Sequence, residues 1–256
     1  MIKVVTTNIR FDNPADKEHN WSGRREILSS FLNSYSPDIF GTQEGWQPQL
    51  NDLHTLVPDY LMSDSHRDWI EDRMYPTIFV KKDRFDNLSS GDIWLSETPE
   101  VPATKSFGSA FPRLCTWAKV RDKDNQKELF IVDVHLDHLK TETRQEQIKV
   151  LITEVQKVNT ESLPMFLLGD FNEAPQDEVR RILVDSSLEL VDPWFMFRKK
   201  EEPSHHNFKG HREDGARIDW ILCSPELTPL EIELYKENDQ GIYPSDHFPV
   251  FASFKF

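Results

Sequence analysis

Residues 164–172 read Pro164-Met165-Phe166-Leu167-Leu168-Gly169-Asp170-Phe171-Asn172. Four apolar residues in succession predict a short buried strand, and Gly169 ends it. A buried strand holds its terminal residues in place, so Asp170 and Asn172 can serve one centre from the same side. Asp170 could take a proton or hold a metal ion, and Asn172 could donate to an oxyanion. Gly, Asp and Asn are also common in ordinary turns, so this stretch alone leaves both interpretations open.

The rest of the chain has the composition of a folded, globular protein. Its 256 residues include 17 Phe and 7 Trp, which is ample material for a core and argues against disorder. No repeat, linker or low-complexity segment divides the chain, which favours a single domain over residues 1–256. The longest apolar runs have the length of a strand, so we expect no membrane span.

Two features favour a cytoplasmic location. No signal-peptide pattern precedes the strand expected at the N-terminus. The only two cysteines, Cys115 and Cys223, lie far apart in apolar surroundings. We therefore expect them to be buried and reduced.

The charge of the chain bears on its substrate. With 30 Lys and Arg against 44 Asp and Glu, the formal net charge is −14. Proteins that bind nucleic acid usually carry a basic face, and an acidic protein repels a phosphate backbone unless metal ions or a local basic patch reverse the field. The charge therefore disfavours long DNA or RNA, but it is compatible with a small phosphorylated molecule bound through a metal.

Apolar periodicity predicts a mixture of strands, hairpins and helices. Strands are expected at 2–9, 38–44, 77–81, 93–95, 115–120, 129–135, 164–168, 217–223, 230–235 and 248–256, and helices at 24–35, 48–57, 141–158 and 177–183. The Pro-rich segment 98–112 is expected to be a surface loop near the site. Residues 198–216, including His205, His206 and His211, could hold a transition metal, but we expect a solvated loop. Two mixed sheets packed face to face, with helices outside, fit this pattern best.

Polar residues recur at or just beyond the ends of the expected strands. They are Asn8, Glu44, His135, Asp170 with Asn172, Asp219 and the pair Asp246-His247. Six such positions in one chain indicate that the strand ends converge on one rim. The residue types are those needed to hydrolyse a phosphate ester, because they combine hard oxygen ligands, a group that titrates near neutral pH and donors for developing negative charge.

Individual roles follow from the chemistry of each residue type. Glu44, with Asn8 and Asp246, offers oxygen ligands for Mg²⁺ or Mn²⁺. His247 can act as general acid or base or hold a phosphate oxygen, with its tautomer fixed by Asp219. His135 and Asn172 can donate to the charge that develops. A serine hydrolase is disfavoured, because three adjacent residues such as Ser245-Asp246-His247 cannot adopt the geometry of a catalytic triad.

Six motifs, in order, resemble those of the endonuclease/exonuclease/phosphatase superfamily. They are Thr7-Asn8-Ile9, Gln43-Glu44, His135-Leu136-Asp137-His138, Gly169-Asp170-Phe171-Asn172, Arg217-Ile218-Asp219-Trp220-Ile221 and Ser245-Asp246-His247-Phe248-Pro249-Val250. Together they cover residues 6 to about 252. The stretch Trp94-Leu95-Ser96-Glu97-Thr98-Pro99 also resembles a compact bacterial branch of this family.

The resemblance implies a four-layer α/β/β/α sandwich of the deoxyribonuclease-I-like class and Mg²⁺-dependent attack of water on a phosphate ester. It places Glu44 at the metal with Asn8 and Asp246 nearby. It also implies that Asp170 orients or deprotonates the attacking water. It implies that Asn172 and His135 stabilise the phosphorane-like state, and that Asp219 pairs with His247 at the phosphate. His138 falls where some members contact phosphate, and Arg113 is a further candidate for substrate binding.

Two departures from the family pattern limit this assignment. Many relatives carry a second acidic residue where this chain has Arg73-Met74-Tyr75-Pro76, so the resemblance implies neither a second metal nor a substrate contact there. Thr7 stands where an aromatic residue is common. A small phosphomonoester or phosphodiester is the favoured substrate. DNA or RNA is the alternative, and a catalytically silent binding module with the same fold is a third hypothesis, against which the intact motif set argues.

Overall fold

The computed structural model describes residues 1–256 and contains two mixed β-sheets. The strands are β1 (Ile2–Asn8), β2 (Ile39–Gly45), β3 (Tyr60–Met62), β4 (Tyr75–Lys81), β5 (Phe85–Trp94), β6 (Leu114–Asp122), β7 (Glu128–His135), β8 (Met165–Asp170), β9 (Asp219–Cys223), β10 (Thr228–Leu234) and β11 (Val250–Lys255). The helices are the 3₁₀ helix η1 (Pro14–His19), α1 (Trp21–Tyr35), α2 (Gln47–Leu56), α3 (Thr141–Val158), α4 (Glu178–Val184) and α5 (Pro193–Met196). The sheet orders are β10-β11-β1-β2-β4-β3 and β5-β6-β7-β8-β9.

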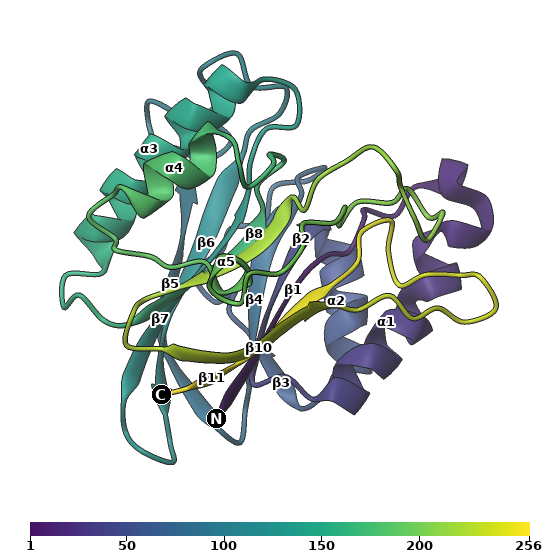
Figure 1. Ribbon diagram of the computed structural model, residues 1–256, viewed down its shortest axis with the longest axis horizontal. Coiled ribbons are helices and arrows are strands. Elements are labelled where there is room, and N and C mark those ends of the chain that lie inside the picture. Colours follow the sequence, from purple (N-terminus) through teal and green to yellow (C-terminus); the bar gives the residue numbers. More distant parts are fainter.

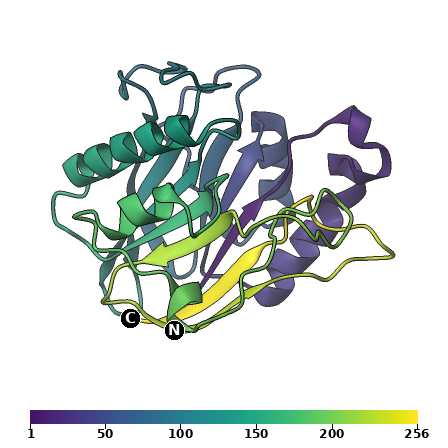
Figure 2. The same ribbon diagram turned by 45° about the horizontal axis from the view of Figure 1, so that its top comes forward.

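The two sheets pack face to face and helices cover their outer faces. Helices α3 and α4 lie against one sheet, α1 and α2 lie against the other, and the two termini lie close together (Figures 1 and 2). Three clusters of buried apolar residues fill the space between the sheets, between the second sheet and α3–α4, and between the first sheet and α1–α2. The expected four-layer α/β/β/α sandwich is confirmed.

The layers explain why the residues of β8 are all apolar before Gly169. Phe166 and Leu168 point into the cluster between the sheets, whereas Met165 and Leu167 point into the cluster beneath α3. Successive side chains of a strand alternate between faces, so a strand covered on both faces carries an unbroken apolar run. The run that predicted a buried strand is therefore the direct result of two packed layers.

The strand directions bring the predicted site residues to one edge. β1 runs parallel to β2 and β7 runs parallel to β8, so Asn8, Glu44, His135 and Asp170 lie at carboxyl ends that face the same way. β9 and β11 are antiparallel to their neighbours, so it is their amino ends that reach this edge. The register pairs Asp170 with His135 on one side and with Asp219 on the other.

Most element boundaries agree with the sequence-based expectation, and the main differences lie in polar strands. β5 extends from Phe85 to Trp94, although only residues 93–95 were expected to be extended. Its polar residues gain strand geometry by pairing with β6 along its whole length. The short elements β3 and α5 were not predicted, because three or four residues carry no measurable periodicity.

No helix in the structure is both long and apolar enough to cross a membrane. Cys115 and Cys223 are free and buried, as expected. Burial raises the pKa of both thiols, that of Cys223 to about 12.

Candidate active site

The end of β8 is shaped by Gly169 and by the turn that follows it. Gly169 has a φ of +143°, and a Cβ atom there would lie 2.0 Å from the carbonyl oxygen of Val134. No other residue fits this position. Beyond it, the backbone N–H of Asn172 donates to Asp170 Oδ1 (2.9 Å), and the Asn172 side chain donates to the Leu136 carbonyl (3.1 Å). Asp170 is therefore held in place by its own turn.

Asp170 is a buried carboxylate with one oxygen directed at several site residues. Its Oδ2 atom accepts a hydrogen bond from Asn8 Nδ2 (3.0 Å) and lies 3.5 Å from His135 Nε2 and 4.0 Å from His247 Nε2. Burial and the nearby carboxylate of Asp219 raise the pKa of Asp170 to about 7. A carboxylate of this basicity can accept a proton near neutral pH.

His247 is paired with Asp219, as the sequence predicted. His247 Nδ1 lies 2.8 Å from Asp219 Oδ2, and this oxygen also accepts a hydrogen bond from the Ser204 hydroxyl (2.6 Å). Burial disfavours the imidazolium, but Asp219 and the other carboxylates nearby outweigh it and raise the pKa of His247 to about 10. His247 is therefore a cation whose Nε2–H faces Asp170.

His135 has the opposite character. Arg113 Nη1 lies 3.0 Å from His135 Nδ1 and can only donate, so the ring proton of His135 is on Nε2, which faces Asp170. Burial and the Arg113 charge hold the pKa of His135 well below its usual range. Arg113 also lies 3.4 Å from Nδ1 of His138. The structure thus brings together His135, His138 and Arg113, with two neutral imidazoles oriented by one guanidinium.

Glu44 and Asn8 lie side by side at the ends of β2 and β1. Glu44 has a φ of +67°, at the point where the pairing of β2 with β4 is interrupted. Asn8 donates to Glu44 Oε1 (3.2 Å) as well as to Asp170. The Oδ1 atom of Asn8 accepts the backbone N–H of Arg10 (2.9 Å). Asn8 therefore turns its amide hydrogens toward the two carboxylates, and its predicted role as a metal ligand stays a prediction.

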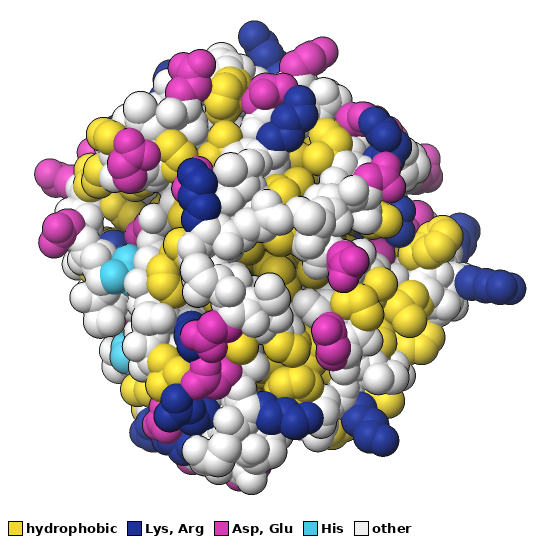
Figure 3. Space-filling model, turned by 90° about the vertical axis from the view of Figure 1, so that its left-hand side faces the viewer, with side chains coloured by type: hydrophobic (Ala, Val, Ile, Leu, Met, Phe, Trp, Pro, Cys, Tyr) yellow, Lys and Arg dark blue, Asp and Glu magenta, His cyan; other side chains and the backbone are white.

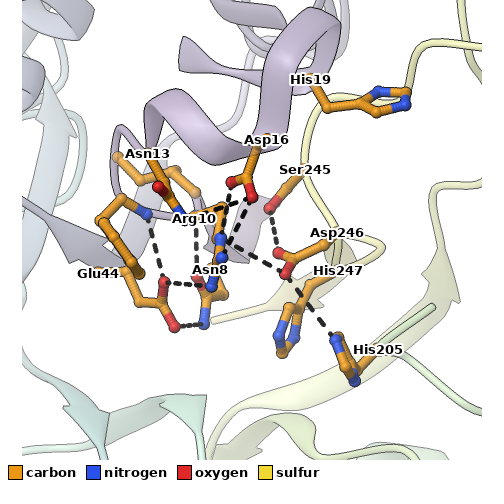
Figure 4. Close-up of polar contacts among 12 residues, drawn as sticks. Asn8, Arg10, Asn13, Asp16, His19, Glu44, His205, Ser245, Asp246 and His247 are labelled. Carbon is orange, nitrogen blue, oxygen red and sulfur yellow. Dashed lines mark hydrogen bonds and ion pairs between the residues drawn. The ribbon is translucent and has the colours of Figure 1, made fainter. Parts of the chain in front are cut away.

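Asp246 lies across from Glu44, and the guanidinium of Arg10 lies between them (Figure 4). Arg10 Nη1 is 4.0 Å from Glu44 Oε2, and Arg10 Nε is 3.9 Å from Asp246 Oδ2. Asp246 also has His205 Nε2 within 3.8 Å. The pKa of Asp246 is lowered, because the charges of His247, Arg10 and His205 outweigh the effect of burial.

The predicted residues surround one cleft of about 410 Å³. Its lining includes Glu44, Arg113, His135, His138, Asp170, Asn172, Asp246 and His247, together with the aromatic residues Phe11, Trp46 and Phe111. Two predicted residues, Asn8 and Asp219, lie directly behind this lining and contact Asp170 and His247. The expected convergence of the eight strand-end residues on one edge of the two sheets is thus observed, and the two further candidates, His138 and Arg113, line the same cleft.

Sequence reasoning missed three residues of the site. Arg10 and Ser204 carry no motif signal of their own, since only the fold brings them to Glu44 and to Asp219. The expectation of a solvated loop at 198–216 is wrong for Ser204 and His206, which are buried. His205 lines the cleft, and His206 is buried against Phe248. The isolated bridge between His205 and His247 brings His205 to the cleft and leaves His206 in the interior.

The donor atoms fit a divalent ion. Glu44 and Asp246 present carboxylates to the cleft, which are ligands that Mg²⁺ and Mn²⁺ prefer. Two further groups have ligand atoms within 4.8 Å of one another, namely His205, Asp246 and His247, and Asp170, Asp219 and His247. In both groups the His247 ring is already bonded to Asp219 through Nδ1. Glu44 belongs to neither group. Its oxygens accept one hydrogen bond each, from Asn8 Nδ2 and from the backbone N–H of Phe11 (3.2 Å each), and each keeps a lone pair for an ion.

Paired carboxylates, oriented imidazoles and amide donors at one edge of two packed sheets are the site of a phosphoester hydrolase with the deoxyribonuclease-I-like fold. The Endonuclease/Exonuclease/phosphatase family model matches residues 5–247, and the chain belongs to this family of phosphoric ester hydrolases.

Solved structures and curated sequences agree with this assignment. A Bacteroides vulgatus endonuclease/exonuclease/phosphatase is 27% identical with a TM-score of 0.92, covering 99% of this chain and 98% of the other. The Bacteroides thetaiotaomicron mannosyl-6-phosphatase is 28% identical with a TM-score of 0.88, and the whole of both chains is covered. Mouse nocturnin is 24% identical over 92% of this chain, which spans only 59% of nocturnin.

Proposed function

We propose that the chain is a Mg²⁺-dependent phosphatase that releases phosphate from a phosphorylated sugar. The observation that carries this proposal is the cleft itself, a hollow of about 410 Å³ that is lined by the reactive side chains and a few aromatic rings. Pockets of roughly 300–1,000 Å³ hold small molecules. The similarity along the full length to a mannosyl-6-phosphatase supports a sugar phosphate in particular.

Each of the predicted catalytic residues has a separate role in hydrolysis. Asp170 is fixed by the turn at Asn172 and accepts a proton from the attacking water. His247, charged and oriented by Asp219, donates to a phosphoryl or leaving-group oxygen. The Nε2–H of His135 and the amide of Asn172 contact the negative charge that develops on the phosphoryl group.

Glu44 is the residue that would hold the metal ion, with Asp246 nearby on the other side of the Arg10 guanidinium. When bound, a divalent ion supplies electrostatic stabilisation of the phosphoryl oxygens. The strained backbone at Glu44 aims its carboxylate into the cleft, because the interruption between β2 and β4 turns this residue away from the regular strand geometry.

A hollow beside the cleft provides room for the sugar. It is lined by Trp46, Trp69 and Arg73, among others, and shares Trp46 and Arg73 with the cleft. Aromatic faces and planar polar groups suit a molecule that has apolar C–H faces and many hydroxyl groups.

Phosphate release from mannose 6-phosphate and other hexose phosphates tests the proposal. We expect turnover with Mg²⁺ or Mn²⁺ and none in excess chelator. Glu44→Gln should lower turnover on the order of 10²-fold or more, because one carboxylate charge at the metal is lost. Its melting temperature should change little.

Glu161→Gln is the matched control, since Glu161 is an exposed carboxylate at the opposite end of β8 that pairs only with Lys119. It should leave turnover unchanged. Full activity in excess chelator would refute the metal requirement, and hydrolysis of every phosphoester except sugar phosphates would refute the substrate class.

A further inference from the structure

We infer that Arg10, held by Asp16, forms a phosphate-binding site that works without a metal ion. The ligand is the dianionic phosphate group of a monoester, so the inference rests on the proposed function and assigns one part of substrate binding to a residue outside the recognised motifs. Arg10 lies two residues after Asn8, and Arg10 lines the cleft.

The guanidinium is fixed on one side and free on the other. Arg10 Nε and Nη2 lie 3.0 and 3.4 Å from the two carboxylate oxygens of Asp16, as Figure 4 shows. Its Nη1 makes no hydrogen bond, because the 4.0 Å from Nη1 to Glu44 Oε2 is too long for one, and the 3.9 Å from Nε to Asp246 Oδ2 is too long as well. Donors therefore remain available to a ligand in the cleft.

The backbone of Arg10 is held as firmly as its side chain. The residue has a φ of +50°, its N–H donates to Asn8, and its carbonyl accepts from Gln49 Nε2 (2.8 Å). The side chain is only 25% exposed and lies over the ring of Phe11. A surface arginine that served only solubility would not be restrained at this many points.

The charge around Arg10 explains why an anion can enter an acidic site. Asp16, Glu44 and Asp246 surround the guanidinium, so without it three carboxylates would repel a phosphate dianion. A planar guanidinium matches two phosphate oxygens at once, which a point charge does not. Because Arg10 occupies the space between Glu44 and Asp246, a divalent ion at Glu44 and the guanidinium can together neutralise the substrate, with no second ion needed.

Titration calorimetry with inorganic phosphate in excess chelator tests this site without requiring turnover. We expect the unmodified protein to bind phosphate, Arg10→Met to weaken this binding about 10-fold or more, and Arg10→Lys to weaken it less. Asp16→Asn should weaken it moderately, because the guanidinium loses its clamp. Melting temperatures would show whether each variant is folded. If Arg10→Met does not fold, the phosphate affinity of Arg10→Lys still tests the inference.

Arg25→Met is the matched control. Arg25 also pairs with a single aspartate, Asp52, through contacts of 3.0 and 3.1 Å, but it lies on α1 outside the cleft. Its loss should leave phosphate binding unchanged. Equal phosphate affinity in Arg10→Met and the unmodified protein, or binding only when Mg²⁺ is present, would overturn the inference. Arg10-dependent phosphate binding in a protein that hydrolyses no sugar phosphate would instead refute the proposed function alone.

Discussion

At the scale of single residues, the contact between Asp219 and His247 sets the orientation and the charge of the His247 ring. Asp219 Oδ2 fixes Nδ1 of the imidazole and stabilises its charge, and Ser204 holds the same oxygen from the other side. His247 Nε2 is thereby directed toward Asp170. When two residues act through one contact, removing either of them removes the same function.

We therefore predict non-additive losses at Asp219 and His247. His247→Ala should lower turnover by roughly 10²- to 10⁴-fold, the usual contribution of a positioned acid or base. Asp219→Asn should lower it through the same ring, so the double variant should lose much less than the product of the two. The measurement is a double-mutant cycle in turnover number. Losses that multiply as independent effects would show that the pair does not act as a unit.

At the scale of elements, strand β5 is stabilised by a buried ion pair, because its sequence has no regular apolar pattern. Asp92 on this strand receives two hydrogen bonds of 2.8 Å from the guanidinium of Arg67, and one of 2.6 Å from Thr116 on β6. The Arg67 side chain is 1% exposed. This network joins β5 and β6 to the loop before β4, and it accounts for strand structure in a segment whose composition is polar.

Asp92 makes the stability of the fold depend on pH. Burial acts to raise the pKa of Asp92, but His66 and Arg67 outweigh it and lower the pKa to about 2. Because the folded-state pKa lies below the ordinary value of 3.8, the stabilisation is complete above about pH 4 and is lost as the pH falls toward 2. We expect this group to contribute about 2 kcal/mol.

The measurement is the free energy of unfolding in denaturant from pH 6 down to pH 2, for the unmodified protein and Asp92→Asn. Asp92→Asn should cost about 3–5 kcal/mol at pH 6, because it leaves the Arg67 charge buried without a partner. The difference between the two proteins should shrink as the pH falls. A difference independent of pH would contradict the assigned role of Asp92.

The whole molecule has an excess of acidic side chains. The face seen in Figure 3 shows no basic groove, because Lys and Arg side chains stand among Asp and Glu there. The net charge of −14 opposes the approach of a long polyanion, whereas a small phosphoester needs only the local cations of the cleft. At physiological salt the screening length is about 8 Å, so these local cations act at short range.

We predict that long duplex DNA is a poor substrate. Plasmid nicking and phosphate release from a hexose phosphate, measured at equal enzyme concentration and at several salt concentrations, compare the two classes directly. Cleavage of the sugar phosphate should change little with salt, since few charges are involved. Plasmid cleavage faster than sugar phosphate hydrolysis, with a steep decline as salt rises, would favour a nuclease instead.

The sequence by itself determined the layers and most of the site. The apolar run before Asp170 reports burial on both faces, and this is a local property because side chains alternate along a strand. Polar residues at strand ends, such as Glu44 and His135, were predictable for the same reason, since strand direction carries them to one edge.

Only the tertiary structure decided what each of these groups contacts. The guanidinium of Arg10 between Glu44 and Asp246, the hydroxyl of Ser204 on Asp219 and the burial of His206 all join segments distant in sequence. Most of the polar strand β5 was not predicted for the same reason, because its geometry comes from pairing with β6 and from the contact with Arg67. Local periodicity records which face of an element is buried, whereas the partners of a polar side chain depend on how the whole chain packs.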